Sequence, residues 1–230
     1  MTRSIRLWDL PTRLVHWSLV AGVVGAFVTA KIGGNLMLWH ERIGLLLVGL
    51  LVFRLVWGFV GSTYARFGHF VRGPGAIAAY IKGQWRGIGH NPLGALSVLA
   101  LLGLLAAQAL TGLFANDDIA FNAPLYPLVS KDTSDALTGW HHRGEIALYV
   151  LVGLHLAAIV YYAVARRERL VPAMITGRRD VGADAPHRDA RGGGPVAFIV
   201  ALVLATAAVW SASGAFNPPP PPPSIDTPAW

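Results

Sequence analysis

The histidines are the side chains best able to do chemistry in this chain, which contains eight of them and no cysteine. His141 and His155 lie 14 residues apart in the stretch GWHHRGEIALYVLVGLHLAA. An α-helix turns by about 100° and rises by about 1.5 Å per residue, so both imidazoles would lie on nearly the same helix face, about 21 Å apart. The adjacent His142 would point about 140° away from His155. Ionisable side chains in such apolar runs are rare and usually functional.

Two further histidines supply partners at the same two depths. His40 stands just before an apolar run, level with His141, and His16 lies a turn or more inside another run, on the same half as His155. Neutral imidazoles that face each other across a helical bundle suit the axial ligation of two haem irons. Copper or zinc would find too few ligands in two residues per level. The remaining alternative is that these histidines only pack in the core or relay protons.

The predicted iron ligands are therefore the pair His16/His155 on the cytoplasmic side and the pair His40/His141 on the periplasmic side. They would hold two non-covalent haem groups, because a chain without cysteine has neither Cys-x-x-Cys-His haem attachment nor thiolate-ligated iron–sulfur clusters. No catalytic residue is predicted. The other histidines, His69, His90 and His187 together with His142, are expected to be solvated loop residues.

Arg54 lies inside an apolar run, 14 residues after His40. The same rotation turns it toward the bundle interior, where an unpaired guanidinium is costly. A haem propionate would be a bidentate partner, and extension of the long side chain to the membrane interface is the alternative. Gly103 and Gly112 also have two interpretations. Their lack of a side chain would let a flat porphyrin approach the backbone, or it would only let helices pack closely.

Five apolar runs have the length of membrane-spanning helices, at about 14–30, 43–60, 94–115, 146–165 and 195–213. Only 13% of the residues are charged, whereas soluble domains carry about 25%. The predicted fold is all-α and integral to the membrane, a four-helix transmembrane haem-binding bundle plus a fifth C-terminal transmembrane helix. The expected domains are a cytochrome b domain at 1–168, a cytoplasmic linker at 169–194, the fifth helix at 195–213 and a proline-rich periplasmic tail at 214–230.

The net charge of +7 reports membrane topology and does not indicate nucleic-acid binding. Basic residues gather before the first run and in the segments 61–92 and 166–194, while the 116–140 segment is acidic. Basic segments stay in the cytoplasm, so we expect a multi-pass protein of the bacterial inner membrane, with a cytoplasmic N-terminus and a periplasmic C-terminus.

Local signals add detail between the runs. Asp9-Leu10-Pro11 is typical of a helix start, and the stretch at 76–85 predicts a short interfacial helix with Tyr80 at headgroup level. The 116–140 segment is expected to be irregular, and NPPPPPPS at 217–224 predicts an extended polyproline II tail.

These segments together resemble the bacterial cytochrome b561 family, which is similar to the cytochrome b subunits of nickel–iron hydrogenases. The resemblance covers about residues 5–177 and includes LWDLPTRLVHWSLV, the histidine that opens the second run, FRLVWGFVGSTYARFGHF, GHNPLGALSVLALLGLLAAQALTGLF, WHH…GLH and RRERLVPAMITG. It implies a four-helix core with two b-type haems on His16, His40, His141 and His155. It also implies electron transfer between the membrane quinone pool and a partner, as part of a respiratory chain.

The function expected from the sequence is electron relay across the bilayer, between the quinone/quinol pool and a periplasmic c-type cytochrome or hydrogenase-like protein. The acidic 116–140 segment is a candidate docking surface for a basic partner, although membrane topology alone also explains its charge. The alternatives are a quinone-linked superoxide oxidase, which the acidic outer side disfavours, and a non-redox transporter or receptor. As an enzyme the chain would be at most a quinol-linked oxidoreductase.

Overall fold

The computed structural model describes every residue except 86, 184 and 218–230. Most of the predicted polyproline tail therefore lies outside the described residues. The elements in chain order are β1 (Thr2–Arg6), α1 (Leu10–Ile32), η1 (Gly34–Leu36), α2 (Met37–Val60), η2 (Thr63–Ala65), α3 (Phe67–Phe70), α4 (Pro74–Ile81), α5 (Pro92–Gly112), η3 (Tyr126–Leu128), α6 (Lys131–Val164), α7 (Leu170–Thr176), β2 (Arg178–Gly182) and α8 (Pro195–Ala212).

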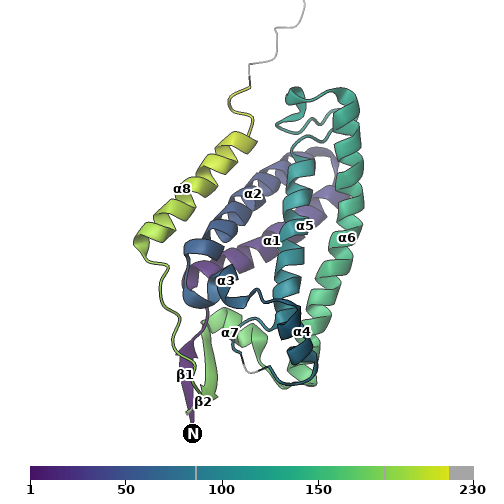
Figure 1. Cartoon of the computed structure of the whole chain (residues 1–230). Coiled ribbons are helices and arrows are strands. Elements are labelled where there is room, and N and C mark those ends of the chain that lie inside the picture. Colours follow the sequence, from purple (N-terminus) through teal and green to yellow (C-terminus); the bar gives the residue numbers. More distant parts are fainter. Residues whose placement is uncertain (86, 184, 218–230) are drawn as a thin grey trace, which may run out of the picture.

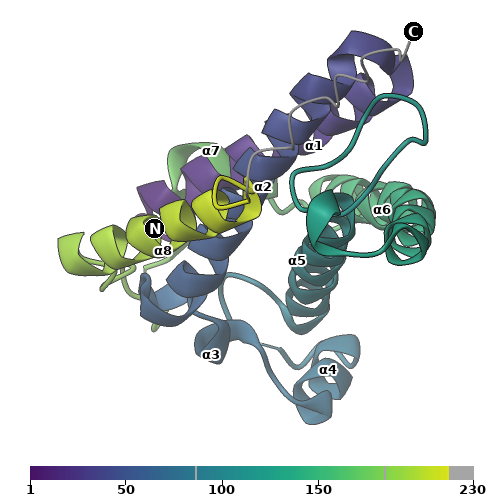
Figure 2. The ribbon, with the colours of Figure 1, turned by 90° about the horizontal axis from the view of Figure 1, so that it is seen from above.

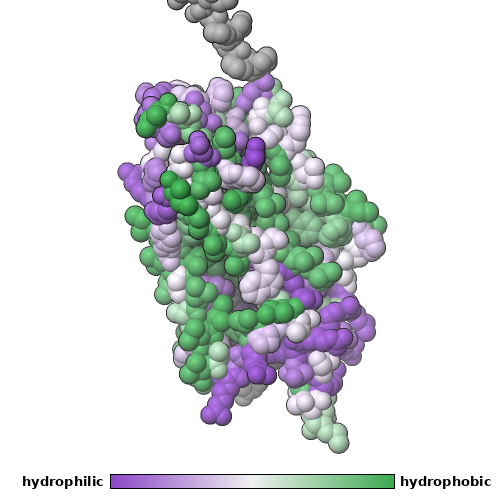
Figure 3. All heavy atoms as spheres, turned by 180° about the vertical axis from the view of Figure 1, so that it is seen from behind, coloured by the Kyte–Doolittle hydropathy of each residue, from purple (hydrophilic) through white to green (hydrophobic). Residues whose placement is uncertain are grey.

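Five of these helices are long and apolar enough to cross a membrane: α1, α2 (with η1), α5, α6 and α8. They form two antiparallel pairs, α1 with α2 and α5 with α6, which meet through α2 and α5. Apolar side chains cover the middle of the face in Figure 3, and hydrophilic ones gather at the end that carries the strands. The predicted all-α membrane fold is confirmed, with a small two-stranded sheet added to it.

The fifth helix packs directly on the core. α8 lies along α2, on the side away from α5 and α6 (Figure 2). Small residues let the two helices approach, since Ala201 and Ala205 are buried against Phe53 and Trp57. A Cβ added at Gly49 of α2 would lie 2.8 Å from a methyl carbon of Val209. Close packing of small residues is the usual basis of helix association in a membrane.

The start of α1 follows the predicted signal. The Oδ1 of Asp9 accepts a hydrogen bond from the backbone N–H of Thr12 at 2.7 Å, and Pro11 occupies the first turn, where it needs no N–H partner. The second carboxylate oxygen of Asp9 accepts from the indole Nε1 of Trp57 at 3.0 Å. This one side chain therefore both caps α1 and joins it to the end of α2.

The fourth membrane helix is much longer than the sequence predicted. α6 begins at Lys131, with the Ser130 side chain accepting from the backbone N–H of Thr133, and it continues to Val164. The expectation of an irregular segment up to residue 140 is wrong for 131–140, because polar residues form the first turns of the helix. His141 and His155 consequently belong to one continuous helix, so the spacing argument applies to them directly.

Three segments that are distant in sequence form one cap at the end of the bundle. β1 pairs antiparallel with β2, with Thr2 opposite Gly182. The backbone N–H of Thr63 donates to the carbonyl of Arg191 at 2.8 Å, and that of Ala190 donates to the carbonyl of Arg6 at 2.7 Å. The N-terminus, the segment after α2 and the segment before α8 therefore lie on the same side of the bundle (Figure 1).

The segment between α2 and α5 holds the predicted short helix, α4. Tyr80 on this helix hydrogen-bonds through its hydroxyl to that of Tyr162 on α6, and the side-chain amide of Asn91 donates to the Tyr162 hydroxyl at 2.8 Å. The Tyr80 hydroxyl therefore joins α4 to α6, and its position at headgroup level stays a prediction.

Candidate functional site

The four predicted ligands come from both helix pairs. His16 lies on α1, His40 on α2, and His141 and His155 on α6. Each predicted pair thus joins one helix of the first pair to α6. All four side chains are half-buried, whereas His142 is exposed. The rotation argument separates His141 from His142 in the same way.

We call His40/His141 the outer pair and His16/His155 the inner pair, after the sides of the membrane predicted for them. The outer pair has a defined geometry. The rings of His40 and His141 have their centres 6.1 Å apart and are perpendicular to each other. Metal–imidazole bonds are about 2 Å long and a ring nitrogen lies roughly 1 Å from its ring centre, so imidazoles on opposite sides of one metal ion have centres about 6 Å apart. The spacing of His40 and His141 therefore fits axial ligation of a single iron.

Hydrogen bonds determine which nitrogen of each outer ring is free. The Nδ1 of His40 lies 3.0 Å from the backbone carbonyl of Ala26, and the Nδ1 of His141 lies 2.9 Å from that of Gln108. A carbonyl can only accept, so both Nδ1 atoms carry the proton and donate. Each Nε2 then keeps its lone pair, which is the state a metal-ligating imidazole needs.

The surroundings of His141 leave it little freedom to move. A Cβ added at Gly112 of α5 would lie 2.8 Å from ring atom Cε1 of His141 and 3.0 Å from its Nδ1. The side-chain amide of Gln108 donates to the His141 carbonyl at 2.8 Å, and Gly144 provides the space that the Gln108 side chain fills. Gly112 thus serves close packing against a predicted ligand, while a Cβ at Gly103 would meet open space.

The inner pair belongs to a larger cluster. His16 has His155 and Arg54 as electrostatic neighbours, and its buried Nδ1 has no hydrogen-bond partner among the described residues. Arg54 is only 7% exposed, and its guanidinium lies 5.1 Å from the ring of Phe67. Its Nη1 also lacks a hydrogen-bond partner in the described part of the chain. Buried polar groups normally have partners. Two unpartnered polar atoms at this depth fit a bound group that carries acceptors, such as a haem with its propionates.

His90 joins this cluster, and the expectation that it is a solvated loop residue is wrong. Its ring packs between Trp8 and Phe70, with centre distances of 4.8 and 4.5 Å, and its buried Nδ1 has no partner among residues 1–85, 87–183 and 185–217. Burial lowers the pKa of His90 to about 3, with the positive charge of Arg54 as the next cause. The folded chain therefore keeps His90 neutral.

His69 and His187 also depart from the solvated picture. Both are half-buried, and the ring of His69 lies edge-on to that of Tyr64 at 5.0 Å. Burial, with Arg72 and Arg66 as further causes, lowers the pKa of His69. The sequence does not predict this burial, because the segment 61–92 stands between two apolar runs and has the composition of a connecting loop. The apolar and aromatic neighbours Tyr64, Phe70 and Ile88 were the available signal that this segment folds back on the bundle.

Within the described part of the chain, no group of three or more His, Cys, Asp or Glu side chains is arranged to hold a metal ion. A zinc or copper site of the usual kind needs at least three protein ligands. A pair of histidines at one depth of the bundle instead suits haem iron, because the porphyrin supplies the other four ligands.

Comparison with known proteins agrees with this chemistry. The family model described as prokaryotic cytochrome b561 matches residues 7–177. The chain is 27% identical over 221 residues to a probable Ni/Fe-hydrogenase B-type cytochrome subunit of Azotobacter vinelandii, covering 80% of this chain and 91% of that protein. It is 22% identical over 213 residues to the protein of the same description from Rhizobium leguminosarum bv. viciae, covering 77% and 89%. No solved structure gives a significant match.

The matched region includes the two helix pairs and all four predicted ligands, and it ends before β2 and α8. Five membrane helices and a b-type cytochrome family together define the protein class. The chain belongs to the prokaryotic cytochrome b561 family and is a multi-pass membrane cytochrome that carries haem b for electron transfer.

Proposed function

We propose that this cytochrome holds two haem b groups, one between His40 and His141 and one between His16 and His155, and that it carries electrons across the bilayer. The observation that carries the proposal is the outer pair, whose ring centres lie 6.1 Å apart and whose Nδ1 atoms both donate to backbone carbonyls. Residues 1–168 are the haem-binding core in this proposal, and the linker 169–194 joins it to the fifth helix.

Haem b supplies a reversible one-electron couple at its iron. The chain positions and tunes that couple. Hydrogen bonds from each Nδ1 fix the tautomer and orientation of the outer imidazoles and raise their basicity. On the inner side, the buried guanidinium of Arg54 provides a donor for a propionate. The 14-residue separation along α6 sets the two levels about 21 Å apart, which spans much of an apolar core about 30 Å thick.

The distribution of charge supports an orientation. The cap formed by β1, β2 and the 62–63 and 190–192 segments carries arginines, among them Arg6, Arg178 and Arg191, whereas the segment between α5 and α6 carries Asp117 and Asp118. We therefore place the cap and the N-terminus in the cytoplasm, and the α5–α6 connection and the C-terminus in the periplasm of the bacterial inner membrane.

The proposed electron path joins the quinone/quinol pool to a periplasmic redox protein. Several relatives are described as hydrogenase cytochrome subunits, which supports a hydrogenase-like partner, and a c-type cytochrome fits the same role. Asp117 accepts three backbone N–H bonds, from Ile119, Ala120 and Phe121, and these hydrogen bonds lower its pKa. The outer segment therefore keeps a negative charge beside the outer pair, as docking of a basic surface requires.

Haem counts on single variants test the ligand assignment. His40→Ala or His141→Ala should remove the outer haem, and His16→Ala or His155→Ala the inner one, so each variant should give one haem per chain by pyridine haemochrome. The matched control is His142→Ala, which removes an exposed imidazole next to a predicted ligand and should keep two haems. Loss of haem in the His142 variant, with retention in the His141 variant, would contradict the assignment.

A second experiment tests the quinone role. A short-chain quinol added to the wild-type protein in nanodiscs should reduce haem b, and the corresponding quinone should oxidise it again. If neither reagent changes the haem spectrum while a small chemical reductant does, the quinone pool is not the partner.

A further inference from the structure

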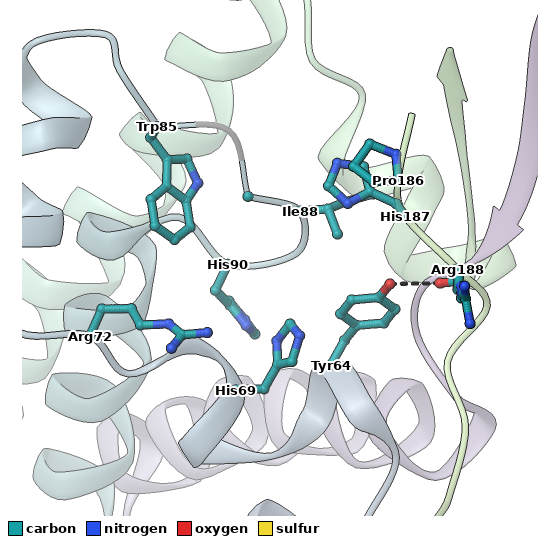
Figure 4. Close-up of a pocket in the computed structure, with 10 residues that line it drawn as sticks. Tyr64, His69, Arg72, Trp85, Ile88, His90, Pro186, His187 and Arg188 are labelled. Carbon is teal, nitrogen blue, oxygen red and sulfur yellow. Dashed lines mark hydrogen bonds between the residues drawn. The ribbon is translucent and has the colours of Figure 1, made fainter. Parts of the chain in front are cut away.

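A cavity of about 370 Å³ opens within the cap, apart from the outer pair. The segment between α2 and α5 contributes Tyr64, His69, Arg72, Trp85 and His90 to its wall, and the segment before α8 contributes His187 (Figure 4). Its volume is in the range of small-molecule sites, about 300–1,000 Å³. His90 on this wall also borders the cluster of His16, His155 and Arg54, but the other wall residues have no part in the electron-transfer role described above.

The wall of the cavity is positively charged. Among the described residues, its lining includes the arginines Arg72 and Arg188 and three histidines, and no Asp or Glu. Among the described residues, neither arginine forms an ion pair. In Figure 4 the guanidinium of Arg72 points toward His69, and these two groups interact electrostatically. An arginine that lines a cavity and has no carboxylate partner can donate charge-assisted hydrogen bonds to a bound anion.

Neutral donors complete the wall. The ring of His90 is held between Trp8 and Phe70, and no described residue hydrogen-bonds to its buried Nδ1. Tyr64 donates its hydroxyl to the carbonyl of Arg188 at 2.6 Å, which joins the two segments that form the cavity (Figure 4). The hydroxyl is thereby occupied, so the remaining side-chain donors among the described wall residues are the two guanidinium groups, the imidazoles and the indole of Trp85.

We propose that this cavity binds a phosphate-type oxyanion, in the form of a phosphate ester. A phosphate group has several acceptor oxygens and one or two negative charges, so it can meet Arg72 and the imidazoles of His69, His90 and His187 together. The volume leaves room for an organic substituent beside Trp85. A neutral quinone headgroup would use the imidazole donors but would leave the guanidinium of Arg72 without a counter-charge.

Two sources could supply this chemistry, a soluble phosphate ester and the headgroup of an anionic phospholipid at the cytoplasmic interface, and two experimental arms distinguish them. In the first arm, inorganic phosphate and glycerol 3-phosphate are titrated into the haem-loaded protein in detergent by calorimetry, at constant ionic strength set with chloride. In the second, the melting temperature is compared in phosphatidylcholine nanodiscs with and without phosphatidylglycerol.

The decisive variant is Arg72→Gln. Its matched control is Arg66→Gln, because both arginines are exposed residues of the same segment but only Arg72 lines the cavity. Arg72→Gln should weaken phosphate binding at least about tenfold, as expected for loss of a charge-assisted hydrogen bond, while Arg66→Gln stays within about twofold. Both should match the wild type in haem content and in melting temperature without phosphate, which excludes misfolding as the cause.

Each outcome decides the proposal. Binding in the first arm that depends on Arg72 supports a soluble ester, and stabilisation only by phosphatidylglycerol that depends on Arg72 supports a lipid headgroup. No effect in either arm would overturn the anion site, as would equal losses in the two arginine variants. Stabilisation by a short-chain quinone, without any response to phosphate or phosphatidylglycerol, would assign the cavity to quinone and also overturn it.

Discussion

Gly112 gives a sharp test of the outer site, because it lies against a predicted ligand without being one. In Gly112→Ala the new Cβ would lie 2.8 Å from Cε1 of His141, inside normal contact distance. The ring cannot yield freely, since its Nδ1 donates to the Gln108 carbonyl at 2.9 Å. Overpacking of this kind costs about 1–3 kcal/mol. Because the ring can turn away once haem has left, we expect the cost to fall on haem affinity, about 5- to 150-fold.

The assay is haem b per chain by pyridine haemochrome after purification without added haem. Gly112→Ala should fall from two haems toward one, and added haem should restore part of the loss. Gly103→Ala, on the same helix, is the control because its Cβ would meet open space. It should keep two haems and, through the better helix propensity of alanine, about 1 kcal/mol, should melt no lower than the wild type. Full haem content in Gly112→Ala, or an equal loss in Gly103→Ala, would refute the reasoning.

Three further predictions concern stability. Asp9→Ala removes the α1 cap and the Trp57 acceptor and should lower the melting temperature by the equivalent of about 1–2 kcal/mol. Asp9→Asn should keep most of this stability. His90 has a pKa of about 3 when folded and an ordinary value of 6.5, so the unfolded chain binds the extra proton between these values. Stability is then lost as the pH falls below 6.5, by up to about 1.4 kcal/mol per pH unit. Between pH 7.5 and 5.5 the melting temperature of His90→Gln should therefore fall less than that of the wild type. Ser134 is fully buried and donates to the Phe114 carbonyl at 2.6 Å. Ser134→Ala should therefore cost about 1–3 kcal/mol, while the exposed Thr133→Ala should cost less, and equal melting of the two would contradict this.

The sequence is most informative where one physical requirement dominates. The five spans follow from runs of apolar residues alone, and the Asp9 cap follows from a local signal. The choice of His141 over His142 needed only the helical period, and α6 is continuous through both residues. The roles of the four histidines as ligands stay predictions, since what supports them is geometry, and haem counts are the direct measurement.

Most of the features that the sequence does not predict depend on contacts between residues far apart in the chain. The β1–β2 pair cannot be seen locally, because Arg6 and Arg178 become partners only after the helices between them have folded. His90 looked like a loop residue because the packing of Trp8 and Phe70 around it comes from two other segments. The polar first turns of α6 hid its start, although Ser130 before a helical segment was a usable capping signal.

The pairing of β1 with β2 also has a consequence for the order of assembly. The two strands are separated by about 170 residues that contain four membrane helices. At roughly 5–20 residues per second, the ribosome needs about 9–35 s to make that stretch. The N-terminal strand must therefore wait, unpaired, until α1, α2, α5 and α6 have been inserted. Closure of the sheet then brings the segment that leads into α8 back to α2, so the last helix docks on a bundle whose other four helices are already in the membrane.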